Sequence, residues 1–183
     1  MANGQFKLYF HSIVLAAAVA FLGIGLIGPE PANARRIERL RLEPNTMAEI
    51  SILLSHGDDL HSALTKQEDE QIEVTLRDIQ VSIARTMAAS IRVKMHERAH
   101  LLKILESMAE NVEIARNSGL TERRERIADV FNMMANIVRI YGVDARFKIF
   151  FCARDKMTWI QTKGRGAYPF PESGERECAL RAP

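Results

Sequence analysis

Residues 65–118 read TKQEDEQIEVTLRDIQVSIARTMAASIRVKMHERAHLLKILESMAENVEIARNS, and neither glycine nor proline interrupts residues 58–118. Apolar side chains recur at three- and four-residue steps from Ile72 to Val112. This spacing is typical of an amphipathic helix. It predicts one helix of about 50 residues, or two helices with a bend near Ala88–Ser90. The stretch therefore indicates a mainly α-helical protein.

A shorter helix is predicted before this stretch. Residues 47–55 have helical apolar spacing, and the helix is expected to end at His56-Gly57, where Gly57 can adopt the left-handed cap conformation. Thr65, followed three residues later by Glu68, has the pattern of a capping box, which predicts that the long helix begins there.

A further helix is predicted after it. Asn117-Ser118-Gly119 is expected to end the long helix, and Thr121-Glu122 is expected to begin the next, which stops at Gly142. A long helix and a shorter one joined by a tight turn form an antiparallel hairpin. The short N-terminal helix or a second copy of the protein would have to cover the remaining apolar seam. The predicted inward side chains of the last helix are Ile127, Val130, Phe131, Met134, Ile137 and Val138.

The composition changes near the C-terminus. No aromatic residue occurs between residues 35 and 130, whereas aromatic residues gather after Phe131. Residues 146–152 and 157–162 flank a short polar turn and predict a β-hairpin. Residues 163–176 have the glycine and proline content of a loop. The expected organisation is a helical hairpin or bundle over 35–143, with a β-hairpin and tail over 144–183 as an appendage.

The first 34 residues have the features of an export signal. A basic residue, Lys7, precedes an apolar run, and Ala32-Asn33-Ala34 matches an A-x-A cleavage pattern. This predicts a periplasmic or secreted protein. The alternative is an uncleaved membrane anchor, because the apolar run is long enough to span a bilayer. The membrane would then be contacted only through this segment.

Cys152 and Cys178 are the two cysteines of the chain. In an oxidising compartment they are expected to form a disulfide that closes a loop over the tail, a closure of about 3–4 kcal/mol in the chain-entropy model. Two unpaired thiols are the alternative. The 25 basic residues nearly balance the 23 acidic ones, so no nucleic-acid partner is expected.

His96-Glu97-Arg98-Ala99-His100 matches the H-E-x-x-H pattern of zinc peptidases, in which two histidines share a helix face and the glutamate activates a metal-bound water. Arg98 stands where such peptidases carry an apolar residue, and no third histidine follows. The helical spacing places both histidines on a polar face away from Leu101 and Leu105. We therefore expect no enzyme. A metal-binding pair completed by a partner, or a plain polar face, are the other interpretations.

A second histidine pair, His56 and His61, flanks Asp58 and Asp59. These imidazoles and carboxylates predict a zinc, nickel or copper site. The alternative is that one aspartate caps a helix and that both histidines are exposed. The two pairs could meet if residues 45–61 fold back along the long helix. No cofactor is otherwise expected.

The C-terminal module interleaves basic and aromatic residues, which predicts either a surface that meets an anionic polymer or a membrane, or aromatic side chains packed on the helices with the basic residues facing water. The aromatic end is also a candidate surface for a protein partner. The candidate surface residues are Phe147, Phe151, Trp159, Tyr168 and Phe170.

Leu64-Thr65-x-x-Glu68 and Leu120-Thr121-x-x-Arg124 are each placed at a predicted helix start. They resemble the paired Leu-Thr-x-x-Gln motifs of periplasmic stress-chaperone and metal-sensing helical proteins. The resemblance implies a helical hairpin that binds unfolded proteins or metal. Neither copy has the glutamine, and the aromatic C-terminus is not part of that pattern.

These features predict an exported helical protein of the cell envelope with a structural or adaptor role. It is expected to bind a protein partner, and a homo-oligomer is one such assembly. The alternative is a periplasmic metal-binding or stress-sensing protein that uses the four histidines, and a zinc peptidase is the third hypothesis.

Overall fold

The computed structural model describes residues 40–93, 95–143, 145–164, 166–170 and 180–181. The described residues all belong to one compact unit. The predicted signal segment, residues 1–34, and Cys178 lie outside the described residues, so the disulfide stays a prediction.

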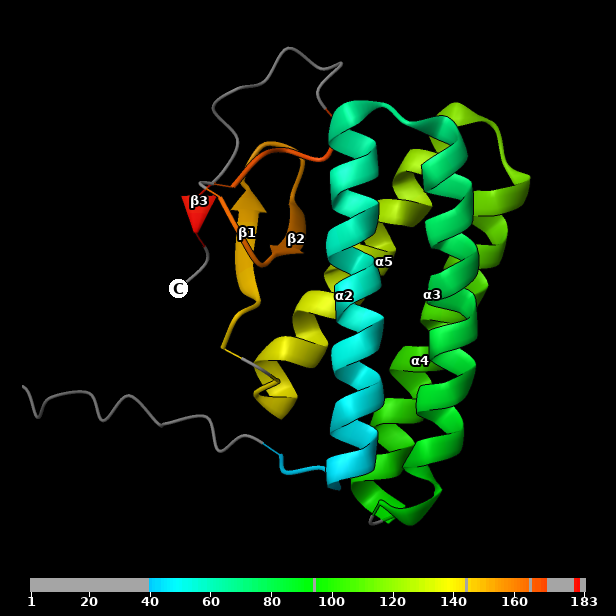
Figure 1. Ribbon diagram of the computed structural model, residues 1–183, viewed down its shortest axis with the longest axis vertical. Helices are drawn as coiled ribbons and strands as arrows, with labels where there is room; N and C mark the ends of the chain where they lie inside the picture. Colours follow the sequence, from blue (N-terminus) through cyan, green and yellow to red (C-terminus); the bar gives the residue numbers. More distant parts are fainter. Residues whose placement is uncertain (1–39, 94, 144, 165, 171–179, 182–183) are drawn as a thin grey trace, which may run out of the picture. The chain divides into compact units, whose positions relative to one another are not determined.

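Four α-helices make up most of the described chain: α2 (Pro44–Lys66), α3 (Asp69–Ala89), α4 (Met95–Asn117) and α5 (Leu120–Tyr141). They alternate in direction, with α2 and α3 forming one layer and α4 and α5 the other (Figure 1). The mainly α-helical prediction is therefore confirmed. None of the helices among the described residues is both long and apolar enough to cross a membrane.

The prediction of one long helix is wrong, and the alternative of two helices located the break correctly. A 3₁₀ turn, η1 (Ser90–Arg92), follows α3, and the chain then reverses rather than bends. The buried Thr46 at the start of α2 donates its hydroxyl hydrogen to the Ala89 carbonyl at 3.0 Å, which satisfies an acceptor left open at the end of α3. Reversal lets the apolar faces of α3 and α4 enter one core, which a single helix of about 75 Å would leave uncovered.

The predicted end of the first helix at Gly57 is also wrong. Helix α2 continues through Gly57 to Lys66, and Gln67, not glycine, adopts the left-handed cap with φ of 59°. Gly57 is buried, and a Cβ atom at this position would lie 2.5 Å from Met134 Sδ of α5 and 3.3 Å from Ile160 Cδ1 of the hairpin. The glycine therefore permits close packing in the middle of a helix.

Thr65 does not begin a helix. Its hydroxyl donates to the carbonyls of His61 and Ser62 within the last turn of α2, and Glu68 is the residue before α3 without a side-chain cap. The predictions for α5 are confirmed. The helix ends at Gly142, with φ of 64°, and its predicted inward side chains are all buried.

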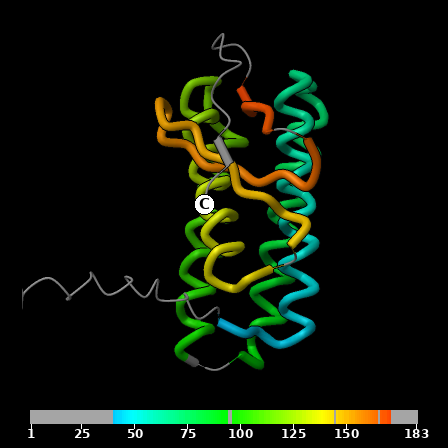
Figure 2. Tube along the Cα trace, turned by 90° about the vertical axis from the view of Figure 1, so that its left-hand side faces the viewer, coloured from blue at the N-terminus to red at the C-terminus, as the bar shows by residue number. Residues whose placement is uncertain are grey.

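The predicted β-hairpin is confirmed. Strands β1 (Lys148–Cys152) and β2 (Met157–Gln161) pair antiparallel, with Phe150 opposite Trp159. A two-residue strand, β3 (Leu180–Arg181), pairs with the other edge of β1. The hairpin lies across the helices, as Figure 2 shows.

The hairpin belongs to the core and is not an appendage. Strand β2 packs against α5 and α2, and all five of its residues are buried. Side chains of a strand alternate between faces, so Ile160 points toward the helices while Trp159 points to the other face. There Trp159 contacts Phe150 and Tyr168, with ring centroids 5.9 and 5.7 Å apart, and Phe170 continues the cluster.

The close approach at Gly57 gives a stability prediction. Gly57→Ser forces its Cβ into Met134 and Ile160, and we expect a loss of about 1–3 kcal/mol in the free energy of unfolding. The matched control is Gly119→Ser, because no atom lies within 4 Å of a Cβ there and serine is a good N-cap residue. Urea unfolding of both variants measures this. Equal midpoints for the two variants would contradict the packing role of Gly57.

Candidate binding site

The two histidine pairs do not come together. Because Thr46 contacts Ala89, the start of α2 lies beside the α3–α4 turn, where His96 and His100 begin α4. His61 follows Thr46 by fifteen positions, roughly 22 Å along the helix axis. Within the described residues, no group of three or more His, Cys, Asp or Glu side chains is placed to hold a metal ion.

The H-E-x-x-H segment lies on an outer face of α4. His96 and His100 are exposed, and Glu97 is half-buried. His100 Nδ1 and the Tyr141 hydroxyl are hydrogen-bonded at 3.0 Å, which occupies one ring nitrogen. Burial raises the pKa of Tyr141 to about 12, so this hydroxyl stays protonated. The hypothesis that a partner completes a metal site on this face stays a prediction.

The other pair has two different environments. His56 lies 3.8 Å from Asp59 on the surface of α2. His61 is 4% exposed and forms a hydrogen bond of 2.7 Å between Nε2 and the Ala167 carbonyl. Since a carbonyl only accepts, Nε2 carries the proton. Burial lowers the pKa of His61 below 6.5, against smaller opposing effects of this hydrogen bond and of Asp58. His61 thus anchors the segment after the hairpin.

Four of the five aromatic residues predicted to form an interaction surface are instead buried. Phe147, Trp159, Tyr168 and Phe170 are each less than 9% exposed, and only Phe151 is half-buried. The reason is that the outer face of the sheet needs its own apolar cover, which the segment after β2 supplies. The alternative is right that these aromatic side chains are buried, but Trp159 and Tyr168 pack with Phe150 on the outer face of the sheet and not on the helices.

Polar groups fix the hairpin to the helices. Asp58 accepts hydrogen bonds from the backbone N–H of Thr162 at 3.1 Å and from its hydroxyl. Asn132 of α5 accepts the backbone N–H of Thr158 at 2.9 Å. Asn132 thus satisfies an N–H of β2, whose outer edge has no strand beside it among the described residues, and Asp58 satisfies the N–H directly after the strand.

A second set of contacts fixes the segment 166–170. The Gln161 side-chain oxygen accepts both the Trp159 indole N–H and the Ala167 backbone N–H, each at 3.1 Å. The Tyr168 hydroxyl donates to Asp155 in the hairpin turn. This bond lowers the pKa of Asp155, and burial, followed by the same bond, raises the pKa of Tyr168 to about 12.

A small apolar pocket lies where the α2–α3 and α4–α5 turns meet. Its volume is about 90 Å³. Leu120, 74% exposed, stands at its edge, and Phe170 forms one wall. Arg124 holds Phe170 in place, because its guanidinium lies 4.6 Å from the ring centroid and donates to the Phe170 carbonyl at 3.3 Å. We call this the apical pocket; its lining residues are Leu64, Gln67, Asp69, Ile72, Leu120, Arg123, Arg124, Ile127 and Phe170.

Sequence reasoning did not find the apical pocket. The available signal was the pair of Leu-Thr segments, since Leu64 and Leu120 both line it. Their distance in the chain hid this relation, which appears only once the two turns lie at the same end of the bundle.

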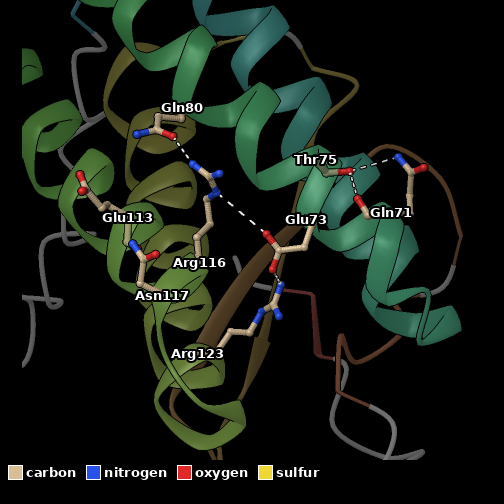
Figure 3. A network of polar contacts seen from close by, with 8 residues as sticks. All are labelled: Gln71, Glu73, Thr75, Gln80, Glu113, Arg116, Asn117 and Arg123. Atoms are coloured by element: carbon tan, nitrogen blue, oxygen red, sulfur yellow. Dashed lines mark hydrogen bonds and ion pairs between the residues drawn. The ribbon is translucent and has the colours of Figure 1, made fainter.

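An ion-pair network beside the pocket ties three helices together (Figure 3). Glu73 of α3 pairs with Arg123 of α5 and lies 3.9 Å from Arg116 of α4. Arg116 also donates to the Gln80 side chain at 2.7 Å. The network holds the α4–α5 turn against α3 and so fixes the position of Leu120.

Comparison with known protein families, with curated proteins and with solved structures finds no match to this chain. The fold itself defines the class of protein. The described residues form an antiparallel four-helix bundle in which a β-hairpin covers the side between the first and last helices.

The burial of His61 gives a pH prediction. Below a pH of about 6.5, His61 is protonated in the unfolded chain but stays neutral in the folded protein. The free energy of unfolding therefore decreases as the pH decreases, by at most about 1.4 kcal/mol per pH unit from this group. His61→Gln keeps an N–H donor and cannot titrate, so we expect a smaller loss between pH 7.5 and 5.5. Urea unfolding at both pH values measures it, with His96→Gln, an exposed position, as the control. Identical pH dependence in wild type and His61→Gln would rule out this role.

Proposed function

We propose that this protein is an exported helical adaptor of the cell envelope, and that it binds a protein partner through the apical pocket. The observation that carries this is the size of the pocket together with the exposure of Leu120. About 90 Å³ is far below the roughly 300–1,000 Å³ of small-molecule and cofactor sites. It suits one aliphatic side chain of a partner.

The surroundings of the pocket favour a preformed site. Leu64, Ile72 and Ile127 belong to the continuous core, so the pocket walls are held by the bundle. Leu120 is the most exposed of the large apolar side chains among the described residues. A partner that covers Leu120 and inserts a side chain beside it gains apolar burial at little ordering cost.

Selection of peptides tests this function. Random displayed peptides are selected on the purified protein, and the Kd of enriched peptides is measured by fluorescence anisotropy. We expect a shared aliphatic anchor residue, loss of binding when it is replaced by alanine, and at least about tenfold weaker binding to Leu120→Glu. A glutamate in the first turn of α5 favours the helix, so the variant should fold.

The matched control is Ile52→Glu, an exposed aliphatic position on α2 outside the pocket, which should bind as wild type does. Peptides that bind wild type and Leu120→Glu equally well, or the absence of any enriched motif, would contradict the proposal.

The adaptor is proposed to act outside the cytoplasm, on the support of the A-x-A pattern after the apolar run and of the cysteine pair. Cys152 is fully buried at the end of β1, next to the hairpin turn. A disulfide to Cys178 would tie the tail to the sheet.

Export and the disulfide are tested by one measurement, the intact mass of the protein recovered after expression of the full chain in a bacterial cell. We expect a chain that begins at Arg35, with a mass about two hydrogens below that of the dithiol. Reduction or Cys178→Ser should lower stability by about 3–4 kcal/mol. A full-length mass would contradict export with cleavage, and free thiols in the recovered protein would contradict the disulfide.

A further inference from the structure

Helix α3 is apolar on two opposite faces. Its core face carries Ile72, Ile79 and Ile83, each no more than 6% exposed. At about 100° per residue, Val74 and Val81 lie roughly on the opposite side, and they are 41% and 54% exposed. A helix that only closed a bundle would carry polar side chains there.

The exposed residues of this second face follow the spacing of a helix–helix seam. They recur at alternating steps of three and four, the repeat by which two helices pack along their length. All are exposed, and two of them, Ala88 and Ile91, line a cavity of about 630 Å³ with residues 43–45 at the start of α2. We call this face the α3 seam; its members are Val74, Arg77, Val81, Ala84, Ala88 and Ile91.

The small side chains of the α3 seam favour another helix as its occupant. Ala84 and Ala88 permit a close approach of a second backbone, and Ile91, 69% exposed, extends the apolar surface past the end of α3. Scattered exposed apolar side chains are common on monomers, but here three large aliphatic side chains, Val74, Val81 and Ile91, are exposed along one side of α3 and the turn after it.

The charges beside the seam select the occupant. Asp78 and Arg85 lie on one flank, seven residues or about 10.5 Å apart, too far to pair with each other. Neither forms an ion pair with any described residue. On the other flank, Glu73 and Gln80 are already engaged with arginines of α4 and α5 (Figure 3).

Of the parallel and antiparallel arrangements of two copies, the antiparallel one matches these charges. In an antiparallel pair with its twofold axis at the level of Ser82, Asp78 of each copy faces Arg85 of the other, and Val81 packs against Ala84. The long side chain of Arg77 can then lie over Ala88 of the second copy. A parallel pair would instead bring Asp78 near Glu73, a like charge.

We propose that this protein forms an antiparallel homodimer through the α3 seam. The dimer is separate from the apical pocket, which lies at the end of the bundle. One helix face offers less area than the roughly 800 Å² per partner of a standard interface, so we expect a Kd in about the micromolar range.

Sedimentation equilibrium of the purified protein at concentrations from about 1 to 500 μM tests the dimer. Wild type should dimerise, and Val81→Glu should be monomeric throughout this range. Asp78→Arg and Arg85→Asp alone should each raise the Kd about tenfold or more, because each places two like-charged pairs in the interface. The double variant Asp78→Arg/Arg85→Asp should restore the wild-type Kd, and an equimolar mixture of the two single variants should form a heterodimer.

Circular dichroism and urea midpoints of these surface variants should match wild type, which separates loss of the dimer from loss of the fold. Leu120→Glu, outside the seam, should dimerise as wild type does. A wild-type monomer at 500 μM (roughly 500-fold above the expected Kd scale), or a dimer unaffected by Val81→Glu, would overturn the proposal. Failure of the double variant to restore dimerisation would overturn the antiparallel arrangement.

Discussion

The close approach of α2, α5 and β2 at Gly57 is the constraint on which the rest of the structure depends. Helices α2 and α5 contact one another little, because the hairpin covers the side between them. The missing side chain at Gly57 lets Met134 and Ile160 reach the α2 backbone. A side chain there would push the three elements apart and open the core between them. The C-terminal hairpin is therefore part of the bundle's core.

Burying a strand and a loop against helices leaves backbone polar groups to satisfy, and the bundle supplies side chains for this purpose. Asp58, His61 and Asn132 each bind one backbone group of the hairpin or of the segment after it. These hydrogen bonds account for the positions of the three residues without a metal or a substrate. The positions of the His61 imidazole and the Asp58 carboxylate are explained by the free-energy cost of leaving a backbone carbonyl or N–H without a hydrogen-bond partner.

Two features remain after the core and these contacts are accounted for. The apical pocket is small and lies beside an exposed leucine, and the α3 seam is a row of exposed side chains that are small or apolar except for Arg77. They lie at different places on the bundle and suit different occupants, a single side chain and a whole helix. A dimer built on the seam would carry two apical pockets, and a partner with two binding segments would gain avidity from this arrangement.

The sequence by itself determined the helical class, the extent of α5 and the β-hairpin, because apolar periodicity, Gly142 and the clustered aromatics are local signals. It also indicated a break near Ala88–Ser90. Only the tertiary structure decided that the chain reverses there, that Gly57 is a packing position and not a helix end, and that Trp159 and Tyr168 are buried together on the outer face of the sheet. The reason is physical. A glycine looks the same in the local sequence whether it ends a helix or permits close packing, and a histidine or an aromatic residue looks the same whether it is buried or exposed. The neighbours that decide between these roles come from distant parts of the chain.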